Sequence, residues 1–237
     1  MRIDGRTEKQ LRKIEIVKDY TMHAEGSVLY CQGNTKVICT ATVQDGVPSF
    51  IFGTGEGWLT AEYSMLPRAT ATRNNRDISR LKLAPRSTEI QRLIGRALRG
   101  AVALKKLGER TVIIDCDVIQ ADGGTRCASI CGGFIALSLA VQKLLTAGLL
   151  EEDPIIKQIA AISVGVIDGV PMLDLCYDED HRADTDMNVV MSSTGGFIEI
   201  QATAEGKELN KKQLDSLLTL AKGGCRRIFH AQSKVLV

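Results

Sequence analysis

Two periodicities in the hydrophobic pattern alternate along the chain and predict a mixed α and β structure. Apolar and polar residues alternate with the period of two that is typical of strands in residues 35–44 and 112–118. Apolar spacings of three and four, typical of amphipathic helices, occur in residues 90–102 and 214–221. Residues 127–147 are apolar on nearly every side, which predicts a buried helix ending at Gly148.

Local signals mark the ends of several of these elements. Thr88 and Gln91 have the spacing of a capping box at the start of the first long helix, which we expect to close at Gly108. Hairpin turns are predicted at residues 168–169 and 194–196, and Asn210 can cap the last helix. Because strands outnumber helices and pair as hairpins, we expect an α+β fold in a single domain over residues 1–237, not a doubly wound parallel sheet.

Composition excludes several classes of protein. With 237 residues, 44% of them hydrophobic and 24% charged, the chain is not disordered, collagen-like or a coiled coil. Its seven cysteines form no C-x-x-C pair, so neither a disulfide framework nor a structural zinc is predicted. The first residues lack the apolar segment of a signal peptide, and no run of about 18 apolar residues occurs. We therefore expect a cytoplasmic protein with no membrane partner.

The small net charge conceals an asymmetry. The whole chain carries +2, but residues 68–110 hold twelve Lys and Arg against three acidic residues, a local charge of +9 that leaves −7 for the remainder. A basic block in an otherwise acidic chain favours a polyanionic partner, because Lys and Arg neutralise phosphates and release counterions. The alternative is a solvated helix face.

Two predicted helix starts have the composition of anion sites. Arg86 directly precedes the first long helix, while Gly124, Thr125 and Arg126 lead into the buried one. Helix N-termini expose unpaired N–H groups with partial positive charge, and glycine lets the backbone approach an anion closely. A plain Gly-Gly turn is the alternative interpretation, and no P-loop or dinucleotide-binding motif is present.

An acidic run lies between two predicted strands. Its members are Asp178, Glu179, Asp180, Asp184 and Asp186. One interpretation is a solvated loop; the other is that two carboxylates hold Mg²⁺ while the metal keeps waters and contacts a substrate phosphate. Combined with an arginine-lined anion site, the second interpretation predicts phosphoryl or nucleotidyl transfer, which depends on positioning and charge neutralisation.

Five segments, in order, resemble one known family. They are Gly5-Arg6-Thr7, GWLTAEYSMLPRAT at 57–70, EIQRLIGRALR at 89–99, DCDVIQADGGTR at 115–126 and DLCYDEDHRADTDMNVVM at 174–191. These segments resemble ribonuclease PH, a family of phosphate-dependent 3′→5′ exoribonucleases also called tRNA nucleotidyltransferases, related to polynucleotide phosphorylase and to exosome ring subunits.

The resemblance implies a fold and a set of site residues. The fold would be of the ribosomal-protein-S5-domain-2-like kind, with two pseudo-repeated βαβ-type subdomains, assembled as a homohexamer built from three dimers. The implied phosphate site comprises Arg86, Gly124, Thr125 and Arg126. Asp180 and Asp186 would be the catalytic aspartates and would hold Mg²⁺ or another divalent cation.

The implied activity is phosphorolysis of RNA. Inorganic phosphate, the co-substrate, would attack the last phosphodiester of precursor tRNA, or of other structured RNA such as rRNA, and release nucleoside diphosphates reversibly. RNA binding or subunit contact would fall on a set of arginines, Arg68, Arg73, Arg76, Arg92, Arg96 and Arg99, with Arg80 and Lys82 in the same basic stretch. The alternatives are a non-catalytic RNA-binding subunit of an exosome-like ring and a hydrolytic, metal-dependent nuclease.

Overall fold

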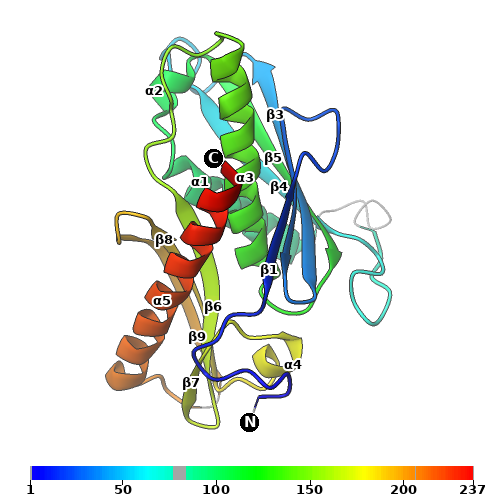
Figure 1. Ribbon diagram of the computed structural model, residues 1–237, viewed down its shortest axis with the longest axis vertical. Coiled ribbons are helices and arrows are strands. Elements are labelled where there is room, and N and C mark those ends of the chain that lie inside the picture. The colour runs from blue at the N-terminus through cyan, green and yellow to red at the C-terminus, as the bar shows by residue number, and fades with distance from the viewer. Residues whose placement is uncertain (1, 77–83, 206, 237) are drawn as a thin grey trace.

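The computed structural model describes residues 2–76, 84–205 and 207–236, which form two β-sheets on either side of a long central helix (Figure 1). The first sheet has the strand order β1-β2-β3-β5-β4, in which only the β4–β5 pair is parallel. The chain crosses from β4 to β5 through α1 (Pro85–Arg99) and α2 (Leu104–Leu107), which makes a βαβ unit. The strands are β1 (Ile14–Lys18), β2 (Gly26–Gln32), β3 (Thr35–Asp45), β4 (Trp58–Met65) and β5 (Arg110–Gln120).

The second sheet is antiparallel between all its neighbouring strands, in the order β7-β6-β8-β9. Both predicted hairpins are confirmed, and Asp168 and Gly169 adopt the positive φ angles, 50° and 77°, that a tight hairpin turn requires. The short helix α4 (Tyr177–Asp180) precedes β8, and α5 (Lys211–Leu236) packs on the sheet. The strands are β6 (Ile159–Ile167), β7 (Val170–Leu173), β8 (Thr185–Ser192) and β9 (Phe197–Ala204).

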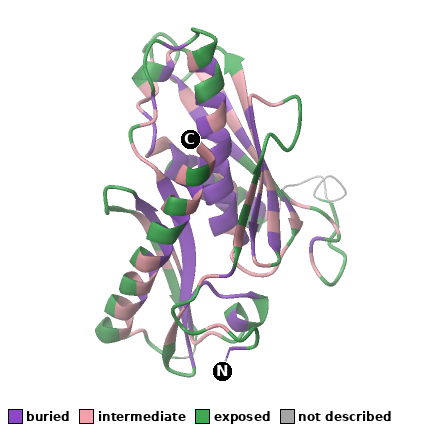
Figure 2. Ribbon diagram, in the orientation of Figure 1, coloured by how far each residue is buried: buried purple, intermediate pink, exposed green. Residues whose placement is uncertain are grey.

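Helix α3 (Thr125–Thr146) is the shared core of the molecule. It contacts β2, β3 and β5 of the first sheet and β6 of the second, and it is buried along most of its length (Figure 2). Close packing requires glycine at Gly132, where a Cβ atom would lie 2.7 Å from the Cys39 sulfur. By length and composition α3 could cross a membrane, but 78% of its most apolar window is buried inside the protein. The α+β class and the buried helix predicted from the sequence are confirmed.

The first long helix differs from its sequence prediction at both ends. It begins at Pro85, not at the predicted capping box of Thr88, and its N-cap residue Ala84 makes no side-chain capping bond. Proline is favoured in the first turn because its ring presets φ and it lacks an N–H that would be unpaired there. Arg86 therefore lies inside the first turn. The helix ends at Arg99, and the predicted closing residue Gly108 instead follows the separate helix α2.

The last helix begins as predicted. The Asn210 side chain accepts a hydrogen bond from the backbone N–H of Gln213 at 2.9 Å, and the Gln213 side chain accepts one from Asn210 at 3.2 Å. The helix continues through Gly224, which is buried and faces Leu173 of β7 at a distance that would crowd a larger side chain. Glycine lowers helix propensity, and close packing explains its presence at this position.

Candidate active site

A polar cavity of about 270 Å³ contains all six residues predicted for phosphate binding and catalysis. Its walls come from the first turns of α1 and α3 in one half of the molecule and from α4 and β8 in the other. Its predicted members are Arg86, Gly124, Thr125, Arg126, Asp180 and Asp186. Two sites that the sequence predicts separately are therefore parts of one cavity.

The anion side of the cavity is built by the turn before α3. Gly123 and Gly124 have φ angles of 73° and 67°, and a Cβ atom on Gly123 would lie 2.6 Å from the Leu175 carbonyl oxygen. Glycine is required there for both reasons. The turn leads directly into a helix of 22 residues, whose N-terminus carries a partial positive charge of about 0.5. This geometry is suited to binding a phosphate oxygen.

Arg126 is held in place by two side chains that the sequence did not predict as site residues. Its Nη1 donates to Gln201 Oε1 at 2.7 Å and to Glu89 Oε1 at 3.2 Å, and Gln201 Nε2 also donates to Glu89 at 3.0 Å. The hydrogen bond from Gln201, reinforced by the charges of Arg126 and Arg86, keeps the pKa of Glu89 below its usual value despite partial burial. An ionised Glu89 thus orients the Arg126 guanidinium.

Arg86 and Tyr63 complete the anion side. Among the described residues Arg86 has no hydrogen-bond partner, and its side chain borders both this cavity and a neighbouring one of about 490 Å³. The buried Tyr63 hydroxyl donates to Thr125 Oγ1 at 2.9 Å, which leaves the Thr125 hydroxyl hydrogen available to a ligand. Burial raises the pKa of Tyr63, so the phenol stays protonated as the donor.

Two carboxylates face the anion side. Burial and the nearby charge of Asp186 raise the pKa of Asp180, and the positive charges of Arg86, Arg126 and Arg12 partly offset this increase. A bound cation would relieve the effect of the neighbouring Asp186 charge on Asp180. Asp186 is fixed on β8 between Gly165 of β6 and Thr203 of β9, so its direction is set by the sheet.

The donor set fits Mg²⁺. In the described part of the chain no cluster of three or more His, Cys, Asp or Glu side chains forms a complete cage for a metal. Mg²⁺ is commonly held through one or two carboxylates while it retains waters and contacts phosphate oxygens. Asp180 and Asp186 in a polar cavity that also has an anion side meet that requirement.

The rest of the acidic run does not enter the cavity. Glu179 is 2% exposed and forms an ion pair with Arg2, whereas Asp178 is exposed and Asp184 lies outside the cavity wall. Five other lining residues were not predicted, namely Ser163, His181, Ala183, Asn188 and Glu205. Asn188 could have been found from the sequence, because the period of two in β8 places it on the same face as Asp186.

The predicted RNA-binding or interface arginines lie outside this cavity. Arg68, Arg73 and Arg76 are exposed, and Arg76 lines the neighbouring cavity. Arg80 and Lys82 fall outside the described residues. Arg92, Arg96 and Arg99 line a third cavity, of about 320 Å³, between α1 and β4.

Two of these arginines are engaged within the chain. Arg96 forms a paired hydrogen bond with Glu199, with both distances 3.0 Å. The Arg99 guanidinium lies 4.6 Å from the Trp58 ring centroid and donates to the Leu59 carbonyl oxygen at 2.9 Å. Arg92 and Arg96 are exposed, and Arg92 has no hydrogen bond among the described residues.

Solved structures share the fold over its full length. Rrp46 of rice (Oryza sativa) superposes with a TM-score of 0.81, 18% identity and complete coverage of both chains. The Archaeoglobus fulgidus exosome with RNA bound to the active site gives 0.80 and 24%, over 97% of this chain and 92% of that one. An archaeal exosome core gives 0.78 and 23%, over 98% and 91%. At these identities the likeness concerns the fold.

The sequence matches a family model over both halves of the molecule. Domain 1 of the 3′ exoribonuclease family matches residues 10–142, which include the first sheet and most of α3. Domain 2 of the same family matches residues 157–224, which include the second sheet and the beginning of α5. With both domains present in order and spanning most of its length, the chain belongs to the ribonuclease PH family of 3′ exoribonucleases.

Proposed function

We propose that the protein is a phosphorolytic 3′→5′ exoribonuclease that trims the 3′ ends of precursor tRNA and of other structured RNA such as rRNA. One observation carries the proposal: two arginines and the N-terminus of a long helix share a single cavity with a carboxylate pair. A hydrolytic nuclease needs the carboxylates but no anion pocket beside them. If inorganic phosphate is the nucleophile, the cavity must hold two anions, the scissile phosphate of the RNA and the attacking phosphate, and the anion pocket then has a role.

The residues of the anion side would bind the attacking phosphate. Arg86 and Arg126 would neutralise its charge, and the N–H groups at Gly124 and Thr125 would orient its oxygens. One phosphate oxygen then attacks the phosphorus of the terminal phosphodiester, and the bond from that phosphorus to the preceding 3′ oxygen breaks. The departing 3′ oxygen takes up the proton that the attacking phosphate carried. The released nucleotide is a diphosphate. Because bonds of similar energy are exchanged, the reaction runs in reverse when diphosphates are abundant.

Asp180 and Asp186 would hold Mg²⁺ or another divalent cation. When bound, the cation would supply charge neutralisation at the scissile phosphate and at the departing 3′ oxygen. The two carboxylates place negative charge close together, and a bound cation would neutralise it. Burial and the charge of Asp186 raise the pKa of Asp180, which supports this interpretation.

The arginines outside the cavity would guide RNA or join subunits. Family membership favours a homohexamer made of three dimers, and the RNA described at the active site of the similar Archaeoglobus fulgidus exosome supports an RNA substrate. We place the activity in the cytoplasm, because the cysteines of the chain are free and buried, as a reducing compartment allows.

A non-catalytic RNA-binding subunit is the second candidate. It is favoured by the likeness to exosome proteins such as rice Rrp46. A subunit without catalysis has no need for both arginines and both aspartates in one cavity, and this chain has all four. Catalysis is therefore the better-supported function.

The test uses RNA with a radiolabelled 3′ end, incubated with Mg²⁺ in the presence and absence of inorganic phosphate. Phosphate-dependent release of nucleoside diphosphates is expected. Release of monophosphates without phosphate would identify a hydrolase, and RNA binding without any release would identify the non-catalytic alternative.

A further inference from the structure

The segment of residues 2–12, called the arm below, connects the two halves of the molecule. It runs beside β7 and α4 of the second half before the chain enters β1 of the first sheet (Figure 1). The backbone N–H of Leu173 donates to the Glu8 carbonyl oxygen at 2.8 Å. Arg2 and Arg12 of the arm are each only 7% exposed. Buried guanidinium groups are costly unless they are paired, so their partners report on their role.

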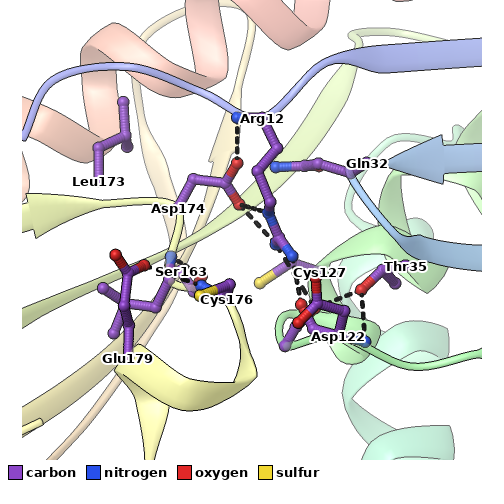
Figure 3. Close-up of polar contacts among 12 residues, drawn as sticks. Arg12, Gln32, Thr35, Asp122, Cys127, Ser163, Leu173, Asp174, Cys176 and Glu179 are labelled. Carbon is purple, nitrogen blue, oxygen red and sulfur yellow. Dashed lines mark hydrogen bonds and ion pairs between the residues drawn. The ribbon is translucent and has the colours of Figure 1, made fainter. Parts of the chain in front are cut away.

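Arg12 is paired with a fully buried carboxylate. Asp174, which follows β7, is 0% exposed and accepts from Arg12 Nη2 at 2.7 Å and Nε at 3.2 Å through one oxygen (Figure 3). Its other oxygen accepts the Arg12 backbone N–H at 2.7 Å. Asp174 has a φ angle of 57°, a left-handed conformation that is uncommon outside glycine. Both oxygens of the Asp174 carboxylate thus bind Arg12, while the Asp174 backbone carbonyl oxygen accepts from Arg2.

The other end of the Arg12 guanidinium contacts the turn before α3. Nη1 donates to the Asp122 carbonyl oxygen, and Nη2 lies 3.5 Å from the Gly123 carbonyl oxygen (Figure 3). Thr35 Oγ1 donates to the same Gly123 oxygen at 2.7 Å and accepts the Asp122 N–H at 3.0 Å. In a trans peptide the C=O and N–H groups point in opposite directions. Fixing the Gly123 carbonyl oxygen toward Arg12 and Thr35 therefore fixes the opposite direction of the Gly124 N–H.

The same arm also holds the helix that carries Asp180. Arg2 pairs with Glu179 through two hydrogen bonds of 2.7 and 2.5 Å and donates to the Asp174 carbonyl oxygen at 2.9 Å. The Glu179 carboxylate accepts the Cys176 N–H at 3.1 Å, which caps α4. Asp180 is the last residue of that helix. One continuous set of contacts thus links the turn before α3 to the carboxylate side of the cavity.

We propose that Arg12 and Asp174 are positioning residues that set the phosphate-binding geometry of the cavity by bridging the turn before α3 to the β7–α4 segment. Neither residue is a member of the cavity wall, so they act through the turn and not by contact with substrate. The proposal rests on the function proposed above only in taking phosphate as the ligand of the turn.

The test measures phosphate and RNA separately in two variants. Arg12→Lys keeps the charge that faces Asp174 but loses the planar fork that reaches the turn. Thr35→Val removes the second donor to the Gly123 oxygen without changing volume or charge. We expect the Kd for inorganic phosphate, measured by calorimetry, and the KM for phosphate to rise roughly tenfold in Arg12→Lys and several-fold in Thr35→Val, with the KM for RNA unchanged.

The matched control is Arg6→Lys. Arg6 donates to the Asp174 carbonyl oxygen at 2.9 Å but has no hydrogen bond to the turn among the described residues. The phosphate Kd of the Arg6→Lys protein should therefore stay within twofold of that of the unaltered protein. If circular dichroism shows that the Arg12→Lys protein is not folded, the phosphate Kd of the Thr35→Val protein decides the test.

The outcomes separate this proposal from the proposed function. An unchanged phosphate Kd in the folded variants, or an equal rise of the KM for phosphate and RNA, would overturn the positioning role while phosphorolysis stands. If the unaltered protein cleaves no RNA but the variants bind phosphate more weakly than it does, the positioning role is supported and phosphorolysis is overturned. Absence of phosphate binding by the unaltered protein would overturn both.

Discussion

Within the short segment between β7 and β8, neighbouring carboxylates have entirely different surroundings. A four-residue helix rotates successive side chains by about 100°, so Asp178 faces solvent, Glu179 faces the buried Arg2 and Asp180 faces the cavity. Asp186 reaches the same cavity from a strand. Sequence spacing alone left both a solvated loop and a carboxylate site open in this run, and the family resemblance selected the two residues that line the cavity.

Replacement of Asp186 or Asp180 by Asn preserves shape but removes a charge from the proposed cation site. We expect phosphorolysis and the reverse addition of nucleotides to fall together by roughly 100-fold or more, because both directions pass through one transition state. Both rates should be measured in each variant, with circular dichroism to verify folding. Asp178→Asn, at an exposed position, is the control and should lose far less activity. A folded Asp186→Asn protein with near-normal rates would show that the cation is held elsewhere.

Arg126→Ala tests the anion side. Loss of one charge-assisted hydrogen bond costs about 1.5–3 kcal/mol, so the KM for phosphate should rise about 10- to 100-fold while RNA affinity changes little. Steady-state kinetics at varied phosphate concentration provide the measurement. Arg227→Ala, on the exposed surface of α5, should leave the KM unchanged. Equal activity of the Arg126→Ala protein at low phosphate would contradict the assignment.

At the level of helices and strands, the sequence predicted what local chemistry controls. The hairpin at Asp168-Gly169 and the capping box of α5 at Asn210 depend on residues a few positions apart, and both are confirmed. The start of α1 was predicted four residues late, because Thr88 resembled an N-cap, whereas the observed N-cap is Ala84 and Pro85 begins the first turn. The partners of Arg126 come from α1 and β9. No local pattern encodes such a meeting, since it depends on how the two sheets pack.

On the outer face of the first sheet, Asp115 makes the stability of the folded state depend on pH. Burial, followed by the charges of Glu62 and Asp117, raises the pKa of Asp115 on β5. The folded state therefore retains this proton to higher pH than the unfolded chain, and stability is lost as pH rises from about 3.8 through the folded pKa. Asp115→Asn should raise the Tm at pH 7 by a few degrees, since 1 kcal/mol corresponds to roughly 2–4 °C at this size.

Thermal melts between pH 3 and 7 test this expectation. The gain of the Asp115→Asn variant should shrink as pH falls below about 4, where the carboxyl group is protonated in both states. Asp45→Asn, at the exposed end of β3, controls for the loss of a carboxylate from the same sheet. A gain that is independent of pH would exclude the electrostatic cause.

At the level of the whole molecule, α3 makes the two sheets one unit. Its buried residues and those of both sheets form one hydrophobic cluster, so we expect residues 1–237 to unfold as a single domain. Leu137→Ala, at a fully buried position of α3, should lower the free energy of unfolding by about 2–5 kcal/mol. Fluorescence of Trp58 reports on the first sheet, and hydrogen exchange in β8 reports on the second. Two separate transitions would show that the halves unfold independently.

The basic stretch makes a prediction about assembly and RNA binding. If exposed Arg73 and Arg76 contact RNA, replacing either by Ala should reduce the slope of log affinity against log salt by about 0.7. If they instead join subunits, the same variants should elute later in size-exclusion chromatography. An unchanged slope together with an unchanged elution volume would leave this stretch as a solvated surface.

The contacts of the arm impose an order on the folding of the chain. Arg2 meets Glu179 across 177 positions of sequence, and Arg12 meets Asp174 across 162. During synthesis Arg2 and Arg12 are made 177 and 162 positions before the carboxylates that pair with them. Closing so long a loop is slow, so we expect the contacts beside the cavity to form only at a late stage of folding. A chain whose synthesis stops after α3 already contains Arg86, Arg126 and the glycine turn, but it lacks Asp174, the carboxylate that pairs with Arg12.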